Sequence, residues 1–165
     1  MDERLTIDQA LNLAVKEHQE GNLQKAKLLY ERILEVEPNH PDALHLLGVI
    51  DYQNGKYEVS INKIKNALKF KTDDAGYYIN LGLAYDALGN EEESTNYYKK
   101  ALEVDASHIK AYLAHFNLGV FYNNIGKFSE ALEHYNQAIE LNNNFFDSHW
   151  NRSLLLLLLG RFEEG

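Results

Sequence analysis

Histidines are the side chains of this sequence best suited to metal binding and proton transfer, and there are seven of them. None belongs to an H-E-x-x-H motif, and the sequence also lacks an EF-hand loop, a phosphate-binding glycine loop and a G-x-S-x-G nucleophile motif. His115 and His149 are 34 residues apart and could meet across neighbouring helices, but no third ligand accompanies them. The absence of cysteine removes thiolate ligands and thiol nucleophiles. We therefore predict no catalytic residue, no bound metal and no cofactor.

A column of asparagines is the other polar pattern. It consists of Asn12, Asn80, Asn117 and Asn151, and Leu46 takes the remaining place. Because asparagine is a mediocre residue inside a helix, its recurrence suggests a use. A row of carboxamides along a groove would offer donors and acceptors to the backbone of an extended peptide. Inheritance from a duplicated ancestral segment, or hydrogen bonding between repeats, explains the column equally well.

Regularly spaced glycines indicate where the helices that contain these histidines and asparagines begin and end. Each follows an amphipathic stretch of about fourteen residues, and successive glycines are 34, 34, 37 and 34 residues apart: Gly21, Gly55, Gly89, Gly126 and Gly160. A helix, a glycine turn and a second helix therefore recur. The predicted helix pairs are 7–20 with 23–36, 41–54 with 57–70, 75–88 with 91–104 and 109–125 with 128–141, followed by one first helix at 146–159.

Small side chains occupy fixed places on both predicted helices, which would let the two helices of a pair approach closely. Seven residues before the glycine stand Ala14, Gly48, Gly82, Gly119 and Ser153. Five residues after it stand Ala26, Ser60, Ser94, Ala131 and Gly165. Four residues further along stand Tyr30, Ile64, Tyr98 and Tyr135. Because these positions share one helical face, we expect the tyrosines to lie in the core.

These columns resemble the tetratricopeptide repeat, in which a Leu-Gly pair, a turn glycine, a small residue, an aromatic residue and a closing proline recur every 34 residues. The closing proline survives only as Pro38. The resemblance implies an all-α fold, a right-handed superhelical solenoid of antiparallel helix pairs that must stack to bury their apolar faces. We expect one array over 1–165, with four full repeats and a partial fifth at about 7–40, 41–74, 75–108, 109–145 and 146–165.

One interval of the register is irregular. Gly89 and Gly126 are 37 residues apart, and the three additional residues fall near Ile109 to Ala114. This segment is compatible with a helix, so it predicts a first helix about one turn longer at its start. A local change in superhelix pitch and a tolerated insertion in the connection between repeats are the alternatives.

First helices line the concave surface of tetratricopeptide arrays, so the resemblance implies that a peptide or protein binds there. The expected groove residues are Asn12, Asn80, Asn117, Asn151, His45, Tyr52, Asp86, Phe116 and Asn123. Arrays of the carboxylate-clamp type hold acidic chaperone tails with lysine and arginine. This chain has apolar residues one turn from the asparagine column instead, namely Val15, Val49, Leu83 and Val120. We therefore do not expect an acidic tail as the partner.

The asparagine column is also similar to that of the arrays of O-GlcNAc transferases and their SPINDLY-type bacterial relatives. Residues 43–49, 115–120 and 149–153 resemble repeats that precede a catalytic domain in those proteins. The main functional prediction is a protein-protein interaction scaffold that is not itself an enzyme. The alternative is a substrate-recruiting segment of a larger glycosyltransferase of this type.

Charge and hydropathy narrow the class of partner. The 16 basic and 25 acidic residues give a net charge of −9, which disfavours nucleic acid and anionic membranes. The segment Met1 to Arg4 lacks the apolar core of a signal peptide, and Leu154 to Leu159 is too short to span a bilayer, so a cytoplasmic location is expected. Some of these six leucines must face outward. We expect self-association through this end, or continuation into a longer protein.

Overall fold

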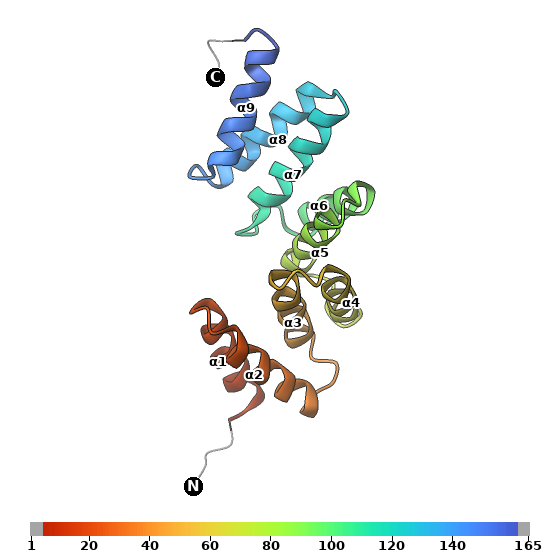
Figure 1. The fold of residues 1–165 in the computed structure, drawn as a ribbon, viewed down its shortest axis with the longest axis vertical. Helices are drawn as coiled ribbons and strands as arrows, with labels where there is room; N and C mark the ends of the chain where they lie inside the picture. Colours follow the sequence, from red (N-terminus) through yellow and green to blue (C-terminus); the bar gives the residue numbers. More distant parts are fainter. Residues whose placement is uncertain (1–4, 162–165) are drawn as a thin grey trace. The chain divides into compact units, whose positions relative to one another are not determined.

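The computed structural model describes residues 5–161, and within this range it contains nine α-helices and no strand. The helices are α1 (Ile7–Gln19), α2 (Leu23–Val36), α3 (Pro41–Gln53), α4 (Tyr57–Ala67), α5 (Ala75–Ala87), α6 (Glu91–Asp105), α7 (Ala111–Asn124), α8 (Phe128–Leu141) and α9 (Phe146–Leu158) (Figure 1). The predicted all-α helical repeat array is confirmed. The chain divides after Thr72 into two compact units, which contain α1 to α4 and α5 to α9.

Short glycine turns join the two helices of each pair. Gly21, Gly55, Gly89 and Gly126 have φ values between 71° and 82°, a left-handed conformation that favours glycine. The amide after each glycine donates to a carbonyl of the preceding helix, as Asn22 does to Glu17 at 2.8 Å. This bond closes the end of the first helix and turns the chain back along it. A fifth glycine turn begins after α9, but Phe162 to Gly165 of the predicted last helix lie outside the described residues.

The three additional residues before Gly126 are shared among two helix ends and a connection. α6 ends sixteen residues after Gly89, whereas α2 and α8 end fifteen after their glycines. α7 begins fifteen residues before Gly126, one more than α5 before Gly89. The prediction that α7 is longer by a whole turn is therefore wrong, because α6, α7 and the connection between them each take one additional residue.

Local hydrogen bonds explain why the connection at 106–110 is not helical. The backbone amide and the hydroxyl of Ser107 donate to Asp105 Oδ1 at 2.9 and 2.7 Å, and the amide of Lys110 donates to His108 Nδ1 at 3.1 Å. Side chains that bond to nearby backbone in this way compete with helix formation. The hydrogen bonds from Ser107 also hold the pKa of Asp105 below its usual range.

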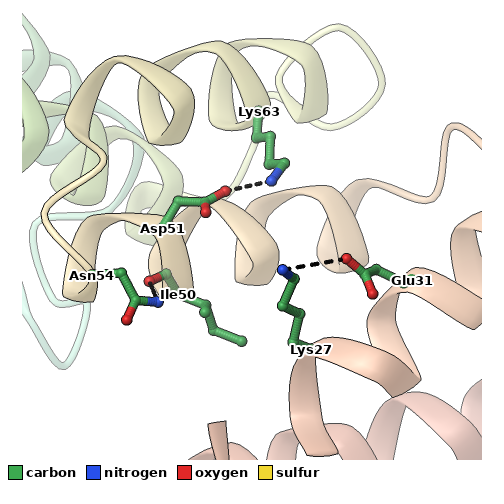
Figure 2. A network of polar contacts seen from close by, with 6 residues as sticks. All are labelled: Lys27, Glu31, Ile50, Asp51, Asn54 and Lys63. Carbon is green, nitrogen blue, oxygen red and sulfur yellow. Dashed lines mark hydrogen bonds and ion pairs between the residues drawn. The ribbon is translucent and has the colours of Figure 1, made fainter. Parts of the chain in front are cut away.

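An ion pair links the helices of the second pair in the first unit. Asp51 of α3 is buried and binds the Lys63 ammonium of α4, as Figure 2 shows. The same view contains a pair on the surface of α2, in which Lys27 Nζ lies 3.6 Å from Glu31 Oε1. The two pairs differ mainly in exposure, so they contribute differently to stability.

We expect Lys63→Met to destabilise the first unit by about 2–3 kcal/mol, because it leaves the buried Asp51 carboxylate without its cation. The matched variant Lys27→Met removes an exposed cation and should change stability by less than about 0.5 kcal/mol. Urea denaturation of both variants measures the difference. Equal effects of the two substitutions would contradict a stabilising role for the α3–α4 pair.

Close contact between glycines and tyrosine rings organises the second unit. A Cβ built on Gly82 of α5 would lie 2.4 Å from Tyr98 Cε1, and one built on Gly119 of α7 would lie 2.6 Å from Tyr135 Cε1. Both rings are buried, which confirms the predicted core tyrosines, and burial raises the pKa of Tyr135 to about 12. Each ring thus fills the space that a side chain on the facing helix would need.

Gly82→Ala should destabilise the protein by about 1–2 kcal/mol, because the methyl group would overlap the Tyr98 ring and overpacking outweighs the better helix propensity of alanine. The exposed replacement Asn96→Ala on α6 controls for a helix-propensity effect. Thermal or urea unfolding compares the two variants. An unfolding midpoint for Gly82→Ala at or above that of the wild type would show that the ring moves aside without cost.

Candidate functional site

Two histidines meet within the second unit, but they are not the pair suggested by the repeat spacing. His115 of α7 and His134 of α8 place their Nδ1 atoms 2.9 Å apart. His149, in contrast, donates from Nε2 to the carbonyl oxygen of Asn143 at 2.9 Å. The helix within the same pair, rather than the next first helix, therefore supplies the partner of His115. Within residues 5–161, no three histidine or carboxylate side chains gather in a metal-binding arrangement.

Burial keeps the histidine pair neutral at physiological pH. Burial lowers the pKa of His115 to about 4, with repulsion from His134 adding to the shift and Glu133 opposing it. The pKa of His134 is lowered by burial and then by Lys99. The ring of Tyr122 stacks on His134 at a centroid distance of 5.3 Å. In the neutral pair one Nδ1 donates and the other accepts, so this contact holds α8 on α7.

The depressed pKa of His115 makes the second unit sensitive to acid. An unfolded histidine takes up a proton near pH 6.5 and the folded one only near pH 4, so stability is lost as the pH falls between these values. His115→Gln should reduce this loss by about 1–2 kcal/mol, a magnitude discounted for the partial exposure of the ring. Chemical denaturation at pH 7 and pH 4.5 tests this expectation, with His149→Gln as the control. A pH dependence of stability unchanged by His115→Gln would contradict it.

The asparagine column lies on first helices of both units, and two of its members bond to their own helices. Asn117 Nδ2 donates to the Leu113 carbonyl and Asn151 Nδ2 to the Asp147 carbonyl, both at 2.9 Å. Asn54, which is outside the column, makes the same bond to Ile50 at 2.8 Å (Figure 2). The bond is therefore a local feature of asparagine in these helices. It uses one of the two N–H donors of each amide and leaves the carboxamide oxygen able to accept a hydrogen bond.

The other predicted groove residues differ in accessibility. His45 is buried in α3, with 8% of its surface exposed. Tyr52 is half-buried and its ring packs 5.5 Å from that of Tyr57. Phe116 is also half-buried, with its ring 5.1 Å from Phe145. Asn123 is half-buried on α7, whereas Asp86 is exposed near the end of α5. Of these five, Asp86 presents the most accessible polar group.

A hollow of about 50 Å³ among α5, α6 and α7 brings Asp86 and Asn117 together. It is lined by Asp86 of α5, by Glu91, Ser94, Thr95 and Tyr98 of α6, and by Asn117, Val120, Phe121 and Asn124 of α7. Burial raises the pKa of the Asp86 carboxyl, and the negative charge of Glu91 raises it further. Sequence reasoning missed Glu91 and Thr95, whose spacing of one helical turn was the only available signal.

Apolar side chains cover the outer face of α9. Phe146 and Trp150 are 83% and 67% exposed, and four leucines of the run are exposed with them: Leu154, Leu157, Leu158 and, just after the helix, Leu159. Leu155 and Leu156 pack into the core with Tyr135. The expectation that part of the leucine run faces outward is confirmed, whereas self-association through it stays a prediction. Within the described range, the helices are too short or too polar to cross a membrane.

Three stretches of the sequence match tetratricopeptide families. Residues 112–145 and 75–108 each match a family described as tetratricopeptide repeat, and residues 48–89 match one described as TPR repeat. Together the three matches cover more than half of the chain. The chain is a tetratricopeptide repeat protein. Two of the matches leave residues 109–111 between them, where the register has its insertion.

Curated relatives of this tetratricopeptide protein are much longer. Human Tetratricopeptide repeat protein 7B is 28% identical over 87 residues, which are 53% of this chain and 10% of the relative. The mouse protein of the same name is 27% identical over 78 residues, 47% of this chain and 9% of the relative. The chain thus matches about a tenth of these relatives.

Solved structures share the fold at low sequence identity. MamA superposes with a TM-score of 0.74 at 22% identity, over 92% of this chain and 86% of that one. PilF from Pseudomonas aeruginosa gives 0.80 at 22% identity, over 92% and 68% of the two chains. YrrB, described as a TPR protein with an unusual peptide-binding site, gives 0.72 at 18% identity, over 94% and 79%. These matches support the fold, and the resemblance to O-GlcNAc transferase arrays stays a prediction.

Proposed function

We propose that this tetratricopeptide protein is a protein-interaction scaffold whose second unit binds an extended peptide along α5, α7 and α9. In this unit α7 contacts both α5 and α9, so Asn80, Asn117 and Asn151 stand at equivalent places on three adjacent helices. Tetratricopeptide arrays generally act as interaction scaffolds, and the structurally similar YrrB is described with a peptide-binding site. Both facts support binding rather than catalysis.

The observation that carries this proposal is the orientation of the column amides. Asn117 and Asn151 each donate one side-chain N–H to a carbonyl of their own helix, one turn back, which fixes the orientation of the amide. Each carboxamide oxygen then accepts a hydrogen bond from a backbone N–H of the peptide. Contacts to backbone rather than to side chains would give affinity with little sequence preference.

The helices beneath the column are held firmly enough to present these amides at fixed spacing. Gly82 and Gly119, which contact the buried tyrosine rings, each lie two residues after a column asparagine. Because the tight glycine contact fixes the position of the helix backbone, it also fixes the position of the asparagine two residues earlier. Preorganisation of this kind reduces the ordering cost of binding.

Replacing Asn80 and Asn117 together with alanine should weaken peptide binding at least tenfold, because it removes two amide contacts of about 1 kcal/mol each. The probe is a fluorescent peptide selected from a random dodecapeptide library on the immobilised wild-type protein, and its affinity is measured by fluorescence anisotropy. Asn96→Ala, on the exposed surface of α6, is the matched control.

Circular dichroism establishes that the double variant is folded. Unchanged affinity in a folded double variant would exclude the asparagine column from the binding surface. Failure to select any binding peptide on the wild-type protein would argue against a peptide-binding scaffold altogether.

A further inference from the structure

We propose that the hollow among α5, α6 and α7 receives the cationic head group of a lysine or arginine side chain of the bound peptide. This inference rests on the proposed function and adds a specific side-chain contact to the backbone contacts of the asparagine column. Asn117 belongs to both, since it is a member of the column and also lines the hollow. A peptide that bonds to Asn117 through its backbone therefore passes the mouth of the hollow.

Two helices present regular faces to this hollow. On α6 the lining residues fall three, four and seven residues after Glu91, and on α7 they fall three, four and seven residues after Asn117. This spacing places each set on one side of its helix. Asp86 closes the hollow from the last turn of α5. The site is therefore built from three rigid elements within one compact unit.

The charged groups around the hollow are both acidic. Asp86 and Glu91 contribute carboxylates. Asn117 donates one N–H of its amide group to the Leu113 carbonyl, and its carboxamide oxygen can accept a hydrogen bond from a ligand. A ligand that pairs with the two carboxylates carries positive charge and donates hydrogen bonds to them. An ammonium group has three donors and a guanidinium group has five, and neither has an acceptor.

Thr95 gives an independent indication of a missing polar partner. Its side chain lines the hollow while only 6% of the residue is exposed. Within residues 5–161 its hydroxyl makes no hydrogen bond. The hydroxyl can therefore donate to, or accept from, a ligand that enters the hollow.

Charge in the hollow is unbalanced. Among the described residues, no lysine, arginine or histidine forms an ion pair with Asp86. Asp86 also lies in the last turn of α5, where the helix dipole places its negative end. The pKa of the Asp86 carboxyl is raised, first by burial and then by the negative charge of Glu91, as expected for a carboxylate without a nearby cation. A cation at this place relieves repulsion among the carboxylates instead of adding to it.

The size and walls of the hollow fit one head group. About 50 Å³ holds one or two water-sized groups, which is enough for an ammonium or the edge of a guanidinium. Val120 and Phe121 supply apolar wall on the α7 side. The aliphatic stem of lysine or arginine packs against such a wall while its charge lies at the carboxylates.

A double-mutant cycle with the selected peptides tests this inference. Each lysine of a peptide is replaced in turn by norleucine and each arginine by citrulline, and affinities are measured for wild type and for Asp86→Asn/Glu91→Gln. We expect one basic residue whose replacement weakens binding to wild type at least tenfold and binding to the double variant less than twofold. Glu92→Gln, an exposed neighbour on α6 outside the hollow, should behave like wild type.

The outcomes separate the hollow from the scaffold. Peptides that require Asn117 but contain no basic residue, or whose basic residues contribute equally in wild type and in Asp86→Asn/Glu91→Gln, overturn the inference and leave the scaffold intact. Selection of no peptide at all overturns both. The double variant removes two like charges and is expected to fold, which its thermal melt verifies. If it does not fold, Asp86→Asn alone is compared with Glu92→Gln in the same cycle.

Discussion

The contact between a glycine on one helix and an aromatic ring on the next is the constraint on which the second unit depends. At Gly82 and Gly119 there is no room for a side chain, because Tyr98 and Tyr135 already fill that space. A ring in such a place permits only one distance and one rotation between the two helices. The outward-facing residues of α5 and α7 are therefore also held at defined positions, although none of them takes part in the contact.

The sequence allowed the fold to be predicted closely because its strongest signals depend on single residue types. Only glycine fits the left-handed position after each first helix, so the turns could be located from Gly21 to Gly160. The partner of His115 could not be predicted in the same way. It depends on how α8 is rotated on α7, and spacing in the sequence pointed to His149 instead. The hollow was likewise hidden, because Asp86 and Glu91 line a common hollow only when α7 packs beside α5 and α6.

Two pairs of ionisable residues in the second unit differ in how their charges are compensated. His115 and His134 give up their charges and bond to each other, so this contact is satisfied within the protein. Asp86 and Glu91 lie together without such an arrangement, and the pKa of Asp86 is raised as a result. The first arrangement fits a structural contact, and the second is typical of surfaces that meet a charged partner.

The insertion before α7 shows where a repeat array can change length without consequence. Residues 106–110 take up additional chain in turns, while Asn117 and Gly119 keep their distances in sequence from Gly126. The positions of the residues in each helix pair are thus fixed relative to the turn glycine of that pair and not relative to the preceding repeat. An alignment that assumes a strict period would shift every later column by three residues and match asparagines with the wrong partners. The connection between α6 and α7 is, for the same reason, a suitable place to insert a protease site or a fluorophore-binding tag.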